Sequence, residues 1–361
     1  MKKSVRIFAI LLAVTLFAGM LTGCTGTASG DTSSNAAKLY IPVIAKGFQH
    51  QFWQVVKQGS EAAGKDLGVD VFFTGPEGES AISTQVDMLN QELAKNPKAI
   101  CLAALDTSAV TSQLKDSFDK KIPVIGFDSG IPNAPAGQVA ATAATNNPNA
   151  AAIGAEHMYP LLKDKISAAT VEKPVVISVF SQDATSASVT GRTKGFAEKM
   201  YDLVKADFAD KAVAITGDYS IINKGDAKPA VIIKTTVGAT PDLTDMTNSA
   251  NGVLKTANLL GIFCSNEGAV TALLAAINAG TPLPDGIQVV GFDAGSGQKA
   301  AVRNGQFLGS ITQDPYQIGY KAVQLAVDAA NGKPVSDIDT GAKWYDKTNM
   351  DQEDIAKLLY D

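Results

Sequence analysis

Two short segments of the chain end in almost the same way, and each carries one carboxylate. The segments "VIGFDSG" (124–130) and "VVGFDAG" (289–295) share five of seven residues and place Asp128 and Asp293 after an apolar run. A carboxylate in this position can accept hydrogen bonds from ligand hydroxyls, and charge-assisted bonds contribute roughly 1.5–3 kcal/mol each. It can instead cap the helix that follows it. The near-identical contexts favour one ligand site over two unrelated caps.

The sequence around the two aspartates alternates between strand and helix patterns. Apolar runs such as "LYIPVIA" and "KAICLAAL" are followed by stretches with apolar residues at helical spacing. This alternation predicts parallel sheets with helices on both faces, and it restarts after residues 129–150. We therefore predict an α/β fold with two doubly wound parallel-sheet lobes. The stretch 207–229 fits neither round and is interpreted as an insertion with short elements of its own.

Ligands of open parallel sheets bind beyond the carboxyl ends of the strands. Asp128 and Asp293 stand at equivalent strand ends of the two rounds. If the two sheets face one another across a cleft, both carboxylates reach the same ligand.

The N-terminus has the pattern of an export signal. Lys2, Lys3 and Arg6 precede the apolar run "IFAILLAVTLFAGML", which is shorter than the ~20 residues that span a membrane. We predict a signal peptide over residues 1–23. The segment "LTGC" resembles the bacterial lipobox, in which the cysteine, here Cys24, is lipidated and becomes the first residue of the mature protein.

The lipobox has an alternative interpretation, and a polar segment follows it. The alternative to a lipobox is a plain secretory signal with an incidental cysteine. Residues 24–37 are small and polar, so we predict a flexible linker between the lipid and the fold.

Composition excludes several classes of function. The formal net charge of −5 argues against nucleic acid as a partner, because phosphate binding needs a basic surface. Cys101 and Cys264 lie in apolar runs and are predicted to be buried and unpaired. The only histidines, His50 and His157, are in no metal-binding motif, so we predict neither a metal nor a cofactor.

Six motifs resemble those of one family in order and spacing. They are "FQHQFW", "PVIGFDSG", "TSASVTGRTKGF", "GIFCSNEGAV", "VVGFDAG" and "SITQDPYQIG". From about Leu39 to the C-terminus the chain resembles the type I periplasmic solute-binding proteins of sugar ABC transporters, in the ribose- and galactose-binding group. The resemblance implies sugar contacts from Arg192 and Asn266 and a hinge glutamine at Gln313, in addition to the two aspartates. Arg192 could instead be a surface charge on a helix, and Asn266 could cap the helix that follows it, alone or in addition to binding sugar.

The family's aromatic loop follows the first strand, and here it contains Phe52 and Trp53. Aromatic rings cover the apolar C–H faces of sugars. Because adjacent side chains point in different directions, we expect Trp53 to face the ligand and Phe52 to point inward; the alternative is that both pack in the core. Gln49 and His50 are expected to line the same loop, together with Lys46.

The resemblance also implies a domain organisation. We expect an N-terminal lobe of residues 38–145 plus 314–342 and a C-terminal lobe of residues 146–313 plus 343–361. Three segments would form the hinge, near residues 144–147, 313–315 and 342–344.

The implied function is capture of a monosaccharide and delivery to an ABC permease. The protein would be a monomer without enzyme activity, anchored through Cys24 on the extracytoplasmic face of the cell membrane. The sequence departs from the family at Ser129, often an arginine or similar residue, at His50, an asparagine in ribose binders, and at Leu243, where an aromatic residue is usual. These departures leave the identity of the sugar open.

Three other functions remain as alternatives. A receptor for autoinducer-2 belongs to the same superfamily, but such receptors carry a lysine where this chain has Val43. An enzyme could use Asp128 and Asp293 as a glycosidase pair. Repressors that share the fold need an N-terminal helix-turn-helix, and this chain has the export signal there.

Overall fold

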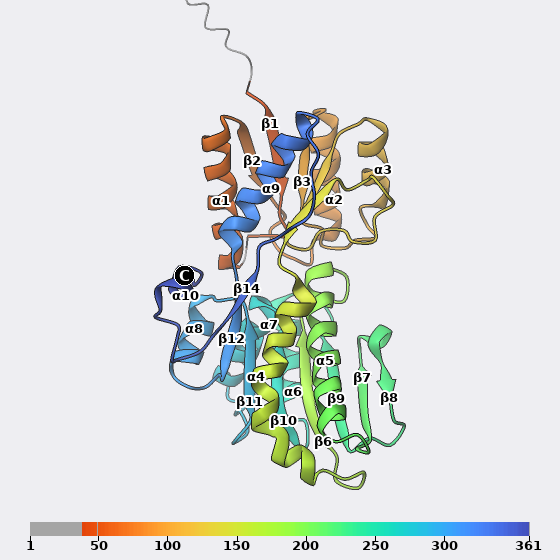
Figure 1. Ribbon diagram of the computed structural model, residues 1–361, viewed down its shortest axis with the longest axis vertical. Helices are drawn as coiled ribbons and strands as arrows, with labels where there is room; N and C mark the ends of the chain where they lie inside the picture. Colours follow the sequence, from red (N-terminus) through yellow and green to blue (C-terminus); the bar gives the residue numbers. More distant parts are fainter. Residues whose placement is uncertain (1–37, 49, 361) are drawn as a thin grey trace, which may run out of the picture. The chain divides into compact units, whose positions relative to one another are not determined.

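The structure is a computed structural model that describes residues 38–48 and 50–360. In this part of the chain the strands form two sheets (Figure 1). The first sheet is entirely parallel, in the order β13-β5-β4-β3-β1-β2. Its strands are β1 Tyr40–Ile44, β2 Asp70–Thr74, β3 Ile100–Leu102, β4 Val124–Phe127, β5 Ala141–Ala144 and β13 Ile338–Asp339. Its helices are α1 Gln51–Leu67, α2 Ile82–Ala94, α3 Thr111–Asp119 and α9 Pro315–Ala330.

The second sheet has the order β14-β12-β11-β10-β6-β9-β7-β8 and is parallel except at its two edges, β14 and β8. Its strands are β6 Val175–Ser181, β7 Val213–Gly217, β8 Lys224–Gly225, β9 Val231–Val237, β10 Leu259–Cys264, β11 Gln288–Phe292, β12 Gly309–Gln313 and β14 Ala342–Tyr345. Its helices are α4 Asn147–Ala168, α5 Ala187–Asp207, the 3₁₀ helix η1 Ser220–Ile222, α6 Leu243–Leu254, α7 Glu267–Asn278, α8 Ser296–Arg303 and α10 Glu353–Ala356.

The two sheets repeat one strand order. The run β5-β4-β3-β1-β2 of the first sheet corresponds to β12-β11-β10-β6-β9 of the second. Asp128 follows β4 and Asp293 follows β11, so the two aspartates occupy equivalent positions. The stretch 207–229 contains β7, η1 and β8, which extend the second sheet beyond β9 (Figure 1).

Both faces of each sheet are buried, as the continuous apolar runs predicted. In the first sheet Val43 and Cys101 pack in the cluster that contains α1 and α9, whereas Ile44 and Ile100 pack with residues of α2 and α3. Cys101 and Cys264 are buried and unpaired. The predicted fold class is therefore confirmed. None of the helices in the described residues is long and apolar enough to span a membrane.

In the described residues the chain passes between the two sheets three times: between β5 and α4, between β12 and α9, and between β13 and β14. Ala342, which we assigned to the first lobe, pairs with Gln313 in the second sheet. The turn lies one residue earlier, at Gly341, whose φ of +77° suits glycine.

Glycines allow the closest helix contacts in both lobes. A Cβ atom at Gly319 of α9 would overlap the carbonyl oxygen of Val56 in α1, and one at Gly59 would overlap that of Tyr316. In the second lobe a Cβ at Gly195 of α5 would overlap the carbonyl oxygen of Pro148 in α4. The pairs α1–α9 and α4–α5 therefore pack backbone against backbone.

We expect Gly319→Ala to lower the free energy of unfolding by about 1–3 kcal/mol, because the added methyl group has no room against α1. Urea unfolding would measure the change. Gly252→Ala is the matched control, since Gly252 lies inside α6 with nothing near its Cβ position, and alanine favours a helix. Equal stability of the two variants would contradict the packing argument.

Candidate ligand-binding site

The two aspartates share an unusual backbone conformation. Asp128 has a φ of +52° and Asp293 a φ of +80°, in the left-handed region that few residues other than glycine adopt. The N–H of Asp128 donates to Ala143 O (3.1 Å), and that of Asp293 to Ile311 O (2.7 Å). Each bond reaches the next strand, so the same turn is built twice. Aspartate tolerates this conformation better than most residues, and its use at both equivalent strand ends points to one shared role.

Arg192 of α5 lies between the two carboxylates. Its guanidinium nitrogens are 3.9 Å from Asp128 Oδ1 and 3.7 Å from Asp293 Oδ2. It also lies over the ring of Phe292, and its Nε donates to Asn147 Oδ1 at 2.7 Å. Arg192 is 2% exposed, so the alternative of a surface charge is excluded.

A second buried cation pairs with carboxylates of the first lobe. Lys46 Nζ is 3.4 Å from Glu79 Oε2 and 3.7 Å from Asp128 Oδ2. Glu79 also accepts hydrogen bonds from Trp53 Nε1 and Gln182 Nε2, both at 2.8 Å. Because Gln182 follows β6, this contact joins the two lobes.

The surroundings shift the pKa values of these groups. Burial alone would raise the pKa of Glu79, but Lys46, His50 and the two donated hydrogen bonds lower it to about 2. Burial would lower the pKa of Lys46, and the nearby carboxylates raise it instead. Burial raises the pKa of Asp128, although Lys46 and Arg192 oppose this effect.

Both aromatic residues, which the structure places in the first turn of α1 and not in a loop, line the site. Trp53 is 1% exposed and Phe52 is 5% exposed, and their rings meet edge to face at 5.0 Å. Phe52, expected to point inward, reaches the same cavity as Trp53. The indole of Trp53 is fixed by its bond to Glu79 and by the ring of Phe127, at 6.4 Å.

Helix starts are capped across the lobes. The first turn of α1 has no acidic residue, and its Gln51 and Phe52 N–H groups donate to Glu267, the first residue of α7 in the other lobe. In return, Gln51 Oε1 accepts from the N–H of Ser296, the first residue of α8. A carboxylate at a helix N-terminus is stabilised by the helix dipole.

Asn266 and Gln313 complete the site. Asn266 caps α7 through Ala269 N–H, as the sequence alternative held, and its Nδ2 also donates to Gln182 Oε1 (2.8 Å). Gln313 Nε2 donates to Asp293 Oδ1 at 2.7 Å. In the described residues nothing donates to the buried Gln313 Oε1. A buried acceptor without a donor is costly, so Gln313 Oε1 is ready to accept a hydrogen bond.

These side chains surround one cavity of about 20 Å³ between the lobes, which we call the central cavity. Its lining residues are Lys46, His50, Phe52, Trp53, Glu79, Asp128, Ser188, Arg192, Asn266, Glu267, Asp293 and Gln313. All the candidate site residues are among them except Gln49, which lies outside the described residues. The volume is about that of one water molecule, so a larger ligand requires the lobes to separate.

Sequence reasoning missed Glu79, Gln182 and Ser188. Gln182 directly follows β6, so the rule that pointed to the aspartates, a polar residue after a parallel strand, would have found it. Leu243 is 53% exposed and does not line the central cavity. In the described residues no group of three or more His, Cys, Asp or Glu side chains is arranged to hold a metal.

Comparison with known proteins places this arrangement in a family. The model of the periplasmic binding protein domain matches residues 41–334. The chain therefore belongs to that family, and the resemblance seen in the sequence is confirmed. The D-allose-binding periplasmic protein of Escherichia coli is 25% identical over 90% of this chain and 93% of its own length. The ribose import binding protein of Bacillus subtilis is 23% identical over 93% and 95%.

Solved structures agree with this assignment. A Brachyspira murdochii protein described as an ABC transporter, LacI family transcriptional regulator, is 42% identical and superimposes with a TM-score of 0.74, covering 90% of this chain and 99% of that one. A solute-binding protein from Agrobacterium vitis with bound D-fucose is 27% identical, with a TM-score of 0.72 over 89% and 100%.

The lowered pKa of Glu79 predicts a specific loss of stability in acid. Its ionised form stabilises the fold above its ordinary pKa of 4.5, and this contribution is lost as the pH falls toward about 2. Between about pH 5 and about pH 3, the free energy of unfolding should therefore fall less steeply for Glu79→Gln than for the wild type. Urea unfolding at both pH values would measure the slopes.

Glu61→Gln is the control for this experiment, because Glu61 is exposed and forms an exposed ion pair with Lys57 across one helical turn. The control should keep the wild-type slope. A wild-type slope in Glu79→Gln as well would mean that Glu79 is not held ionised by its neighbours.

Proposed function

We propose that this protein is a solute-binding lipoprotein that captures a monosaccharide between its lobes and delivers it to an ABC permease. The observation that carries the proposal is the central cavity, where carboxylates from two equivalent turns meet Arg192 and the unpartnered Gln313 Oε1. The D-allose-binding protein, the ribose import binding protein and the solute-binding protein with bound D-fucose point to the same class of ligand.

The lining matches the chemistry of a sugar. Ring hydroxyls would donate to Asp128, Asp293 and Gln313 Oε1. Arg192 and Asn266 would donate to the remaining oxygens, and His50 and Gln49 would contact the rim. Trp53 and Phe52 would cover an apolar face of the ring.

Capture requires motion, because the central cavity is smaller than any sugar. Bonds between the lobes, such as Gln182 to Glu79 and Ser129 to Ser188, must break for a ligand to enter. The three crossings between the sheets are the natural hinge, and domain closure of this kind occurs in microseconds to milliseconds. A ligand that replaces these bonds would stabilise the closed form.

The proposal includes the site of action. A lipidated Cys24 followed by the linker 24–37 would hold the folded lobes at the extracytoplasmic face of the membrane, close to the permease. The receptor for autoinducer-2 remains the second candidate, because it would use the same cavity between lobes, and the ligand panel below separates the two.

We expect Asp128→Asn and Asp293→Asn to weaken sugar binding about tenfold or more, a loss of about 1.4 kcal/mol. Asparagine keeps the shape of the side chain and tolerates positive φ, so folding should be retained. Calorimetric titration would measure the affinity for the best ligand of a panel containing D-allose, D-ribose, D-arabinose, D-fucose, D-glucose, D-galactose and autoinducer-2.

The matched control is Asp285→Asn, which removes the same charge from an exposed loop. Wild-type affinity in both site variants would contradict the assignment of the two carboxylates. Binding of autoinducer-2 alone would favour the receptor.

Lipidation predicts a change of location on mutation of Cys24. We expect the wild-type protein to stay with the membrane fraction and Cys24→Ala to be released from it, because the covalent lipid is the only proposed anchor. Fractionation of expressing cells with metabolic labelling by palmitate would measure both. Membrane retention of an unlabelled Cys24→Ala protein would contradict the anchor.

A further inference from the structure

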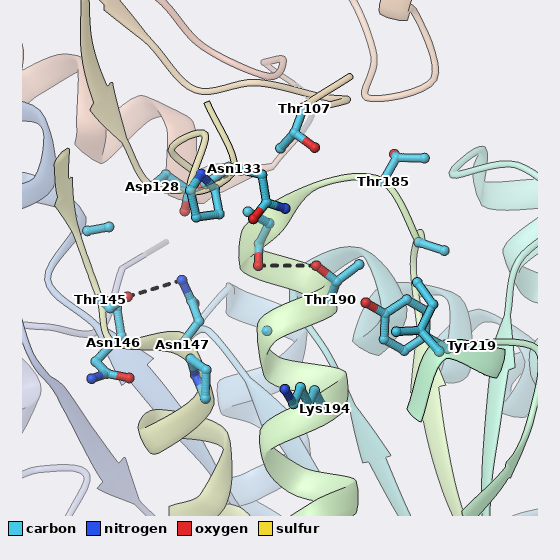
Figure 2. Close-up of a pocket in the computed structure, with 18 residues that line it drawn as sticks. Thr107, Asp128, Asn133, Thr145, Asn146, Asn147, Thr185, Thr190, Lys194 and Tyr219 are labelled. Carbon is cyan, nitrogen blue, oxygen red and sulfur yellow. Dashed lines mark hydrogen bonds between the residues drawn. The ribbon is translucent and has the colours of Figure 1, made fainter. Parts of the chain in front are cut away.

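A second and much larger cavity lies beside the central one. It has a volume of about 610 Å³ and is open to both lobes (Figure 2). The residues that matter here are Ser129 and Asn133 from the first lobe and Thr190, Lys194 and Tyr219 from the second. We call it the outer cavity. Its volume falls within the roughly 300–1,000 Å³ of small-molecule sites.

A single layer of side chains separates the outer cavity from the central one. Asp128 lines both cavities. Ser129 on the outer side and Ser188 on the central side are joined by one hydrogen bond of 3.1 Å. Because these serines belong to different lobes, separation of the lobes breaks this bond and makes the two cavities continuous.

Ser129 contributes only a short side chain to the layer between the two cavities. The serine is 7% exposed, and its hydroxyl reaches no farther than Asp128 and Ser188. At this point the two cavities are therefore separated by one short side chain from each lobe.

The insertion 207–229 supplies one wall of the outer cavity. Tyr219 and the 81% exposed Ile221 belong to it. The insertion is held firmly: Tyr219 N–H donates to Thr235 Oγ1 at 3.1 Å, and Asp218 Oδ2 accepts from Val237 N–H at 3.0 Å. Gly217, with a φ of +117°, lies so close to Thr235 that a Cβ would overlap its carbonyl oxygen. These contacts hold the backbone of Tyr219 in place at the wall of the outer cavity.

The exposed face of α5 adjoins this wall. Figure 2 shows Thr190 and Lys194 on this helix, with the ring of Tyr219 beside them and Asn133 across the cavity. In the described residues the ammonium of Lys194 has no ion pair or hydrogen bond, and neither does the hydroxyl of Tyr219. One aromatic ring, with hydroxyl, amide and ammonium donors around it, matches the apolar face and hydroxyl rim of a sugar ring.

We propose that the ligand is a disaccharide, whose first ring occupies the central cavity and whose second ring lies in the outer cavity against Tyr219, within reach of Lys194. This inference rests on the proposed function, because the first ring is the monosaccharide unit described above. Among the described residues that line the outer cavity, Asp128 is the only carboxylate and Lys194 adds a cation, so the second ring is neutral or acidic rather than cationic.

The experiment compares disaccharides with their component sugars on the full-length protein. Calorimetry would measure the affinities for maltose, cellobiose, lactose, melibiose and galacturonobiose, and for glucose, galactose and galacturonate. We expect one disaccharide to bind about tenfold or more tighter than either component. Tyr219→Ala and Lys194→Ala should reduce this difference about fivefold or more and leave the affinity for the component sugar unchanged.

Lys228→Ala is the matched control for Lys194→Ala, because Lys228 is an exposed lysine of the insertion that does not line the outer cavity. It should bind as the wild type does. Monosaccharides that bind as tightly as every disaccharide would overturn the second ring but leave the proposed function standing. Failure of all the disaccharides to bind, when a monosaccharide of the panel under Proposed function does bind, would overturn the second ring alone, and failure of every sugar in both panels would overturn both proposals. Equal loss of mono- and disaccharide affinity in Tyr219→Ala would overturn the outer cavity.

Discussion

The structure depends on one buried guanidinium between two carboxylates. A charge removed from water must be paired, and the buried side chain of Arg192 is almost completely shielded from solvent. Its hydrogen bonds go to Asn147 Oδ1 and Ser265 O, and its charge is balanced by Asp128 of the first lobe and Asp293 of the second. The repeated strand order places both aspartates at the same strand end of their sheets, and the repeated left-handed turn directs both toward the interface. The duplication of the fold thus serves one shared site.

Carboxylates outnumber cations around this pair, and the excess is balanced by backbone dipoles. Glu267 meets the first amides of α1, and Asp293 accepts the N–H of Glu267 itself. The backbone N–H groups balance the negative charge only in part, because burial and the neighbouring Asp293 still raise the pKa of Glu267. Such a site favours neutral ligands rich in hydroxyl donors over anions, which would add to the negative charge.

The sequence predicted the fold and much of the site because both have local signals. Strand and helix patterns showed the two rounds, and Asp128 and Asp293 were visible because they follow apolar strands in nearly identical segments. Glu79 was missed because it lies in a loop five residues beyond the end of β2, and only the folded chain brings it to Lys46 and Gln182. The wall formed by Tyr219 was also invisible, since the insertion contacts α5 through tertiary packing alone.

The caps that α1 and α8 receive across the interface have a mechanical consequence. When the lobes part, the Gln51 and Phe52 amides lose Glu267, and Ser296 loses Gln51. These bonds between the lobes therefore favour the closed form even without a ligand. Part of any measured affinity reflects this free energy of closure rather than contacts with the ligand. A second protein that binds the outer ends of the two lobes and stabilises the open form would lower the affinity for the ligand without entering either cavity.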